Sequence, residues 1–143
     1  MWRKYFLASI LTCLLSVYQV GSLTEKQVQA TVKMVRNTCQ SKTKASTDDI
    51  EKMHLGDWNI DREAMCYMQC ALNMHKLLNK ENKFDYESGM NQLKILPESF
   101  RGHTLECMNQ CKDAVVTPND KCIAAYEFAK CFYFCNPEKY FLP

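Results

Sequence analysis

Three pairs of cysteines recur at a spacing of four residues, and this spacing constrains the fold more than any other feature of the sequence. The pairs are Cys66 and Cys70, Cys107 and Cys111, and Cys131 and Cys135. Residues four positions apart lie one above the other on the same face of an α-helix, so each pair predicts a helix with two sulfurs along one stripe. Neither the C-x₂-C knuckle of zinc sites nor a C-x-x-C redox motif occurs, so we expect no metal site.

The N-terminus indicates export. A positively charged start precedes an apolar run over residues 5–17, and small residues follow at 20–22. This arrangement predicts a signal peptide over residues 1–22 and a mature domain over residues 23–143. The apolar run is shorter than the roughly 20 residues of a membrane-spanning helix, which disfavours the alternative of a retained signal anchor. We therefore expect a secreted, extracellular protein.

The remaining cysteines indicate a cross-linked helical domain. Cys13 leaves with the leader, and an even number of cysteines is left of the nine in the chain. An even number in an exported chain is typical of a disulfide framework. Glycine and proline are scarce, with 4 of each in the whole sequence, which favours helices over a turn-rich β fold. The sequence therefore predicts an all-α fold.

Capping residues and apolar spacing place about six helices. Thr24 to Gln27 form a capping box before the first helix. The others are expected after Ser46 or Thr47 to about His54, from Asp61 to about Asn79, from Asp85 to Pro97, over about Ser99–Val115, and from Asn119 or Asp120 to Pro137. An apolar tail, Tyr140-Phe141-Leu142-Pro143, follows the last helix.

Charge and motifs exclude several classes of function. The 18 Lys and Arg residues include two in the leader, so the mature chain balances its 16 Asp and Glu residues, which argues against a nucleic-acid partner. The sequence has no G-x-S-x-G, no His-Asp pair and no unpaired cysteine, so we expect no catalytic residues, no cofactor and no enzyme activity. A saposin-like membrane module is disfavoured by its different cysteine gaps and by the absence of a cationic excess.

Six cysteines carry a resemblance to a known family. Cys39, Cys66, Cys70, Cys111, Cys122 and Cys131 leave three residues between the second and third and eight between the fifth and sixth. Local strings agree, among them Gly56-Asp57, Cys66-Tyr67-Met68-Gln69-Cys70, Ala124-Ala125-Tyr126, Lys130-Cys131 and the ending Pro137-Glu138-Lys139-Tyr140-Phe141-Leu142. The whole mature chain resembles the insect odorant-binding and pheromone-binding proteins in this respect.

The resemblance implies three disulfides, Cys39–Cys70, Cys66–Cys122 and Cys111–Cys131. Cys107 and Cys135 are additional to the family pattern. If the last two helices are antiparallel, one turn before Cys111 faces one turn after Cys131, which predicts a fourth bridge, Cys107–Cys135. The alternative pairs Cys107 with Cys131 and Cys111 with Cys135, and it would offset the two helices.

The resemblance also implies a function and a site. It implies a carrier with an internal apolar cavity that transports a small hydrophobic, odorant- or pheromone-like molecule through extracellular fluid to a receptor. Methionine-rich linings accept varied apolar shapes, although a single methionine is most often ordinary core. The expected ligand-binding residues are Leu55, Trp58, Met68, Leu72, Met90, Leu93, Leu96, Met108, Phe128, Tyr140 and Phe141. We expect the tail to form a wall of the cavity and the Tyr140 hydroxyl to bond an oxygen of the ligand.

Other expected partners are a membrane odorant receptor and a second copy in a weak homodimer. Three histidines, His54, His75 and His103, are candidates for acid-triggered ligand release, because histidine titrates near pH 6. The alternative is that each is an ordinary surface or loop histidine.

Overall fold

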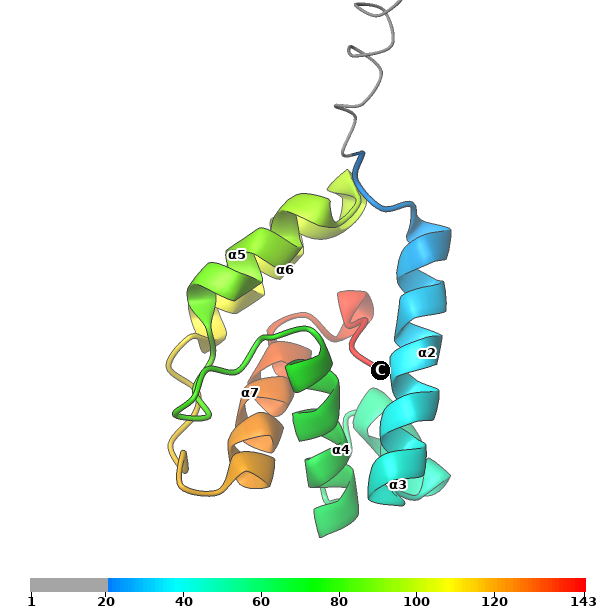
Figure 1. Cartoon of the computed structure of the whole chain (residues 1–143), viewed down its shortest axis with the longest axis vertical. Helices are drawn as coiled ribbons and strands as arrows, with labels where there is room; N and C mark the ends of the chain where they lie inside the picture. Colours follow the sequence, from blue (N-terminus) through cyan, green and yellow to red (C-terminus); the bar gives the residue numbers. More distant parts are fainter. Residues whose placement is uncertain (1–20) are drawn as a thin grey trace, which may run out of the picture.

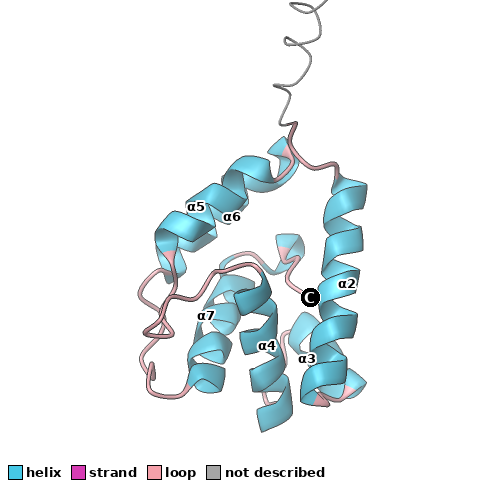
Figure 2. Cartoon of the chain, viewed as in Figure 1, coloured by secondary structure: helices cyan, strands magenta, loops and turns pink. Residues whose placement is uncertain are grey.

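The computed structural model describes residues 21–143, so the predicted signal peptide lies outside the described residues except for Gly21 and Ser22. The described elements are α2 (Glu25–Thr43), α3 (Thr47–His54), α4 (Arg62–Met74), α5 (Tyr86–Ile95), α6 (Glu98–Cys111), α7 (Lys121–Cys135) and the 3₁₀-helix η1 (Pro137–Lys139). Within this range the fold is all-α, as predicted (Figure 2). Its β-structure is one isolated bridge between Leu78 and Phe84.

The helices surround the C-terminal tail. Helix α4 packs against α7 and α2, while α6 packs against α7 and α5. In Figure 1, α5 and α6 lie together on one side and α2 on the other, with α4 and α7 below them. The red C-terminal tail enters the space between these helices and ends beside α2. The tail is therefore an internal element rather than a free end.

Side-chain caps place most helix starts where the sequence predicts them. The Thr24 hydroxyl accepts a hydrogen bond from the Gln27 N–H at 3.2 Å, and the Gln27 side chain accepts one from the Thr24 N–H at 2.8 Å. Ser46 caps α3, Asp85 caps α5 and Asp120 caps α7. These bonds satisfy N–H groups that have no partner within the first turn of a helix.

Helix α4 is shorter than predicted, because it ends at Met74 rather than near Asn79. Lys76 adopts a left-handed conformation with φ of 54°, and the Leu77 N–H bonds the Leu72 carbonyl at 2.9 Å. This is the arrangement of a Schellman motif, which closes a helix by returning the chain against its last turn. The chain then reverses through the Leu78–Phe84 bridge, which brings Phe84 into the core.

Helix α6 also ends early, at Cys111 rather than near Val115. The Glu127 carboxylate of α7 accepts N–H bonds from Val116 and Thr117 at 2.7 and 2.9 Å. These bonds hold the connection in a non-helical path, so a contact between elements decides where the helix stops.

Four disulfides join the helices. Cys39–Cys70 joins α2 to α4, Cys66–Cys122 joins α4 to α7, and Cys107–Cys135 and Cys111–Cys131 join α6 to α7. These are the three pairs that the resemblance implied and the fourth pair that helix geometry predicted. The two bridges between α6 and α7 lie one helical turn apart, and the alternative offset pairing does not occur.

Candidate ligand-binding site

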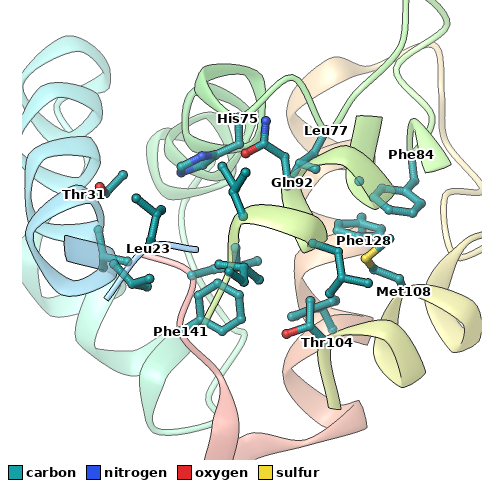
Figure 3. Close-up of a pocket in the computed structure, with 18 residues that line it drawn as sticks. Leu23, Thr31, His75, Leu77, Phe84, Gln92, Thr104, Met108, Phe128 and Phe141 are labelled. Atoms are coloured by element: carbon teal, nitrogen blue, oxygen red, sulfur yellow. The ribbon is translucent and has the colours of Figure 1, made fainter. Parts of the chain in front are cut away.

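A cavity of about 150 Å³ lies between α2, α5, α6, α7 and the tail. Figure 3 shows its 18 lining residues, most of which are apolar. The volume is below the range of roughly 300–1,000 Å³ that is common for small-molecule pockets. It is close to that of an apolar cavity that accepts benzene. The cavity therefore fits a compact molecule.

Four helices each present to the cavity two residues that are four positions apart. Such residues share one helix face, so each helix contributes a narrow stripe to the wall. The pairs are Val28 and Val32 on α2, Gly89 and Leu93 on α5, Thr104 and Met108 on α6, and Phe128 and Phe132 on α7. Much of the cavity wall therefore consists of one stripe of residues from each of these four helices.

Phenylalanine rings form one side of the cavity. Phe84 stacks on Phe128 with a centroid separation of 4.5 Å and an interplanar angle of 14°. Phe132 lies 5.9 Å from Phe128 and 6.4 Å from Phe141, and Phe141 meets Phe100 edge-to-face at 5.2 Å. Because ring faces and edges pack in preferred geometries, this series gives the wall a defined shape.

The tail forms part of the wall. Phe141 and Leu142 line the cavity, and Leu142 is buried. The N-terminal segment lies at the opposite edge, where the Leu23 N–H bonds the Ile95 carbonyl at 2.7 Å and both residues line the cavity. Both ends of the described chain therefore contribute to the site.

Five of the expected ligand-binding residues line the cavity, namely Leu93, Leu96, Met108, Phe128 and Phe141. The other six do not line it. Trp58, Met68 and Leu72 are buried in the helix-packed core, and Met90 packs against that core next to the cavity-lining Gly89. Leu55 caps the end of α3 and is 82% exposed, so it faces solvent.

Tyr140 lies outside the cavity as well. Its ring packs in an aromatic cluster with Tyr133 at 5.1 Å, His54 at 5.6 Å and Trp58 at 6.5 Å. Burial raises the pKa of the Tyr140 hydroxyl, which makes no hydrogen bond within the described residues. The tail lines the cavity through the next residue, Phe141. In this geometry the Tyr140 hydroxyl is therefore not placed to bond a ligand in the cavity.

Sequence reasoning missed the residues that α2 and the N-terminal segment supply. Val28 and Val32 are apolar residues at helical spacing, but that spacing is the same for a helix that packs on a core. Leu23 has no periodic signal, because it precedes the first helix. Its position follows from a tertiary backbone contact with Ile95.

Four polar side chains lie at the cavity. They are Thr31, His75, Gln92 and Thr104. The Thr31 hydroxyl donates to the Gln27 carbonyl at 2.9 Å. Burial lowers the pKa of His75, which favours the neutral imidazole. No Lys, Arg, Asp or Glu is among the lining residues, so the described site favours an uncharged ligand.

Cross-linked helices around an apolar cavity, with a chain terminus as one wall, are suited to binding a small hydrophobic molecule. The PBP/GOBP family model matches residues 21–134, and the chain belongs to this family of odorant-binding carrier proteins, which are not enzymes. Members of the family and fold bind small hydrophobic ligands. Over residues 21–143, no helix is long and apolar enough to cross a membrane.

Individual proteins agree with this assignment. General odorant-binding protein 72 of Anopheles gambiae is 29% identical over 118 residues, which cover 82% of this chain and 97% of the mosquito protein. The crystal structure of odorant binding protein 4 of Chrysopa pallens has a TM-score of 0.80 and 40% identity, and covers 85% of this chain and 99% of its own. Odorant binding protein 5 of Apis mellifera has a TM-score of 0.78 and 27% identity, with 86% and 100% covered.

Proposed function

We propose that this protein is a secreted carrier that binds a small hydrophobic, odorant- or pheromone-like molecule in the cavity and transports it through aqueous extracellular fluid to a receptor. The observation that carries the proposal is the apolar cavity of about 150 Å³, closed on one side by the tail. Leu93, Leu96, Met108, Phe128 and Phe141 are the expected ligand contacts that this cavity brings together. Membership of a family that binds small hydrophobic ligands supports it.

The size of the cavity sets the scale of affinity. A compact ligand that buries about 200–300 Å² of apolar surface gains about 5–7.5 kcal/mol at roughly 25 cal/mol per Å². This corresponds to dissociation constants from roughly 200 down to roughly 3 μM. Such binding holds a dilute apolar molecule in water and still releases it on a short timescale.

A displacement titration tests the proposal. The protein comprising residues 23–143, with all four bridges formed, is titrated with a fluorescent apolar probe and then with alcohols, aldehydes, esters and hydrocarbons. We expect saturable probe binding that a chemically coherent subset of the panel reverses. Absence of saturable binding in correctly bridged protein would contradict the carrier function. Size-exclusion chromatography of the same samples tests the proposed weak homodimer.

Filling the space beside Gly89 is expected to weaken ligand binding by roughly fourfold or more. A Cβ at this position would lie 2.7 Å from Phe84 Cζ and 2.9 Å from Met108 Cε, so both of these cavity-lining side chains must move. The lost space amounts to about one methylene, worth roughly 0.8 kcal/mol of ligand contact. Gly89→Ala is compared with Gly102→Ala, where nothing lies within 4 Å of the added Cβ. Equal affinities for the two variants would show that the ligand does not occupy this cavity.

Ligand affinity is also expected to fall as the pH drops below about 6.5. Burial lowers the pKa of His75 from its ordinary value of 6.5, so the imidazole stays neutral at pH 7 and gains its charge only at a pH below 6.5. A charge on the wall of an apolar cavity disfavours an apolar ligand. Probe titrations between about pH 7.5 and about pH 4.5 should show this loss in the natural protein. His75→Gln, which cannot gain the charge, should flatten it.

Stability has the same sign of pH dependence and must be measured in parallel. Burial lowers the pKa values of His54, His75 and His103 in the folded protein. The unfolded chain therefore binds more protons below pH 6.5, so the histidines' contribution to stability is complete above that pH and is lost as the pH falls through their lowered pKa values. Circular dichroism at each pH separates loss of affinity from loss of fold.

A further inference from the structure

Thr104 differs from the other polar residues of the cavity. It lies in α6, is 5% exposed, and lines the cavity. Its Oγ1 makes no hydrogen bond within the described part of the chain and is shielded from solvent. Buried hydroxyls nearly always have a partner, so an unpaired one at a cavity wall indicates that a bound molecule supplies the partner.

The helix itself offers Thr104 a partner that it does not use. Threonine in a helix commonly donates to the carbonyl four residues earlier. Thr31 does so to Gln27 at 2.9 Å, and Thr43 does so to Cys39 at 2.8 Å. Thr104 stands in the same relation to Phe100 but makes no such bond. With no partner in the described part of the chain, the hydroxyl keeps both its donor and its acceptor capacity.

The shape and charge of the cavity narrow the class of ligand further. Its volume is close to that of a cavity that accepts a single aromatic ring. The stacked pair of Phe84 and Phe128 forms a flat wall, against which a ring packs well. The lining contains no Lys or Arg to pair with a carboxylate. Figure 3 shows Thr104 beneath this ring wall and His75 on the opposite side.

The other polar groups need no ligand. Thr31 is satisfied within α2, and the side chains of His75 and Gln92 are partly exposed, so water can serve them. Thr104 is the buried, unsatisfied polar group of this lining. One hydrogen-bonding position in an otherwise apolar wall matches a ligand with one polar group.

We infer that the ligand is a compact, uncharged, ring-sized molecule with one oxygen, such as an aromatic alcohol, phenol, aldehyde or ketone, and that the Thr104 hydroxyl bonds this oxygen. The inference rests on the proposed function and specifies the ligand of the same cavity. The hydroxyl donates to a carbonyl ligand and can donate to or accept from a hydroxyl ligand.

The test compares two ring compounds that differ by one hydroxyl group, in variants that differ at Thr104. Binding of benzyl alcohol and of toluene is measured by ligand-observed NMR for the natural protein, Thr104→Val and Thr104→Ser. Valine keeps the shape and removes the hydroxyl, and serine keeps the hydroxyl. We expect Thr104→Val to weaken benzyl alcohol by roughly two- to twelvefold, the range of one hydrogen bond, and to leave toluene unchanged or tighter. Thr104→Ser should retain most of the preference for benzyl alcohol.

Three outcomes would overturn the inference while leaving the carrier function intact, provided that the fluorescent probe binds. These are failure of both ring compounds to bind, an equal effect of Thr104→Val on the two compounds, and tighter binding of a long-chain carboxylate than of benzyl alcohol. Failure of the probe itself to bind is the separate result that contradicts the carrier function. Thermal unfolding of Thr104→Val controls for folding, and its Tm should equal or exceed that of the natural protein, because an unsatisfied buried hydroxyl is removed.

Discussion

Removal of both bridges between α6 and α7 is expected to lower the free energy of unfolding by about 6 kcal/mol, which exceeds the sum of the two separate losses. The cysteines of these bridges are separated by 28 and 20 residues, and the shorter loop lies inside the longer one. With one bridge in place, the other closes only a short loop of roughly eight residues. Each bridge alone is therefore expected to contribute about 2.5 kcal/mol while its neighbour is present, so the two separate losses sum to about 5 kcal/mol.

Three variants measure this coupling. Cys107→Ala with Cys135→Ala removes the outer bridge, and Cys111→Ala with Cys131→Ala removes the inner bridge. The third variant combines all four changes. Alanine is chosen because Cys107 and Cys111 are buried, and a hydroxyl there would have to be desolvated. Urea unfolding followed by circular dichroism gives the free energies. Strictly additive losses would contradict the nested-loop account.

Replacement of Phe128 by alanine is expected to lower the free energy of unfolding by about 3–5 kcal/mol, the usual cost of removing a fully buried ring. Phe128 is 1% exposed and stacks on Phe84 at 4.5 Å. It also lines the cavity, so the volume of the lost ring adds to the binding space. We expect the ligand preference to shift from one-ring towards two-ring compounds.

Phe134→Ala is the matched control, because Phe134 lies on the same helix and is 55% exposed. Its change in stability should stay within about 0.5 kcal/mol. Urea unfolding compares the two variants, and the probe titration with one-ring and two-ring competitors compares their cavities. An unchanged size preference in a folded Phe128→Ala protein would mean that the ring does not bound the ligand space.

The cysteine pattern predicted more of this fold than hydrophobicity did. The spacing of four residues predicted the helix face on which each cysteine lies. Capping residues such as Thr24 and Asp85 predicted where helices start from the local sequence alone. Helix ends depended on contacts that the local sequence does not contain. The left-handed Lys76 closes α4, and the Glu127 carboxylate holds the chain that leaves α6.

The site could be predicted only in part, for a related physical reason. Met68 and Met108 are both buried apolar residues on helices, but only Met108 faces the cavity. Apolar character predicts burial and does not distinguish a wall of a cavity from the interior of a packed core. In the sequence, Thr104 is an ordinary polar residue of a helix. That its hydroxyl is buried and has no hydrogen-bond partner is apparent only in the structure.

The positions of the bridges divide the cavity into a fixed half and an adjustable half. Two bridges hold α6 to α7 and a third holds α7 to α4, whereas α5 carries no cysteine and α2 is bridged only at Cys39, near its C-terminal end. Two hydrogen bonds connect the N-terminal end of α2 to the junction between α5 and α6. The Leu23 N–H donates to the Ile95 carbonyl, and the Ser99 hydroxyl donates to the Glu25 carboxylate. A longer ligand is therefore expected to displace the segments that these hydrogen bonds hold, whereas the bridged helices α6 and α7 keep Met108 and Phe128 in place.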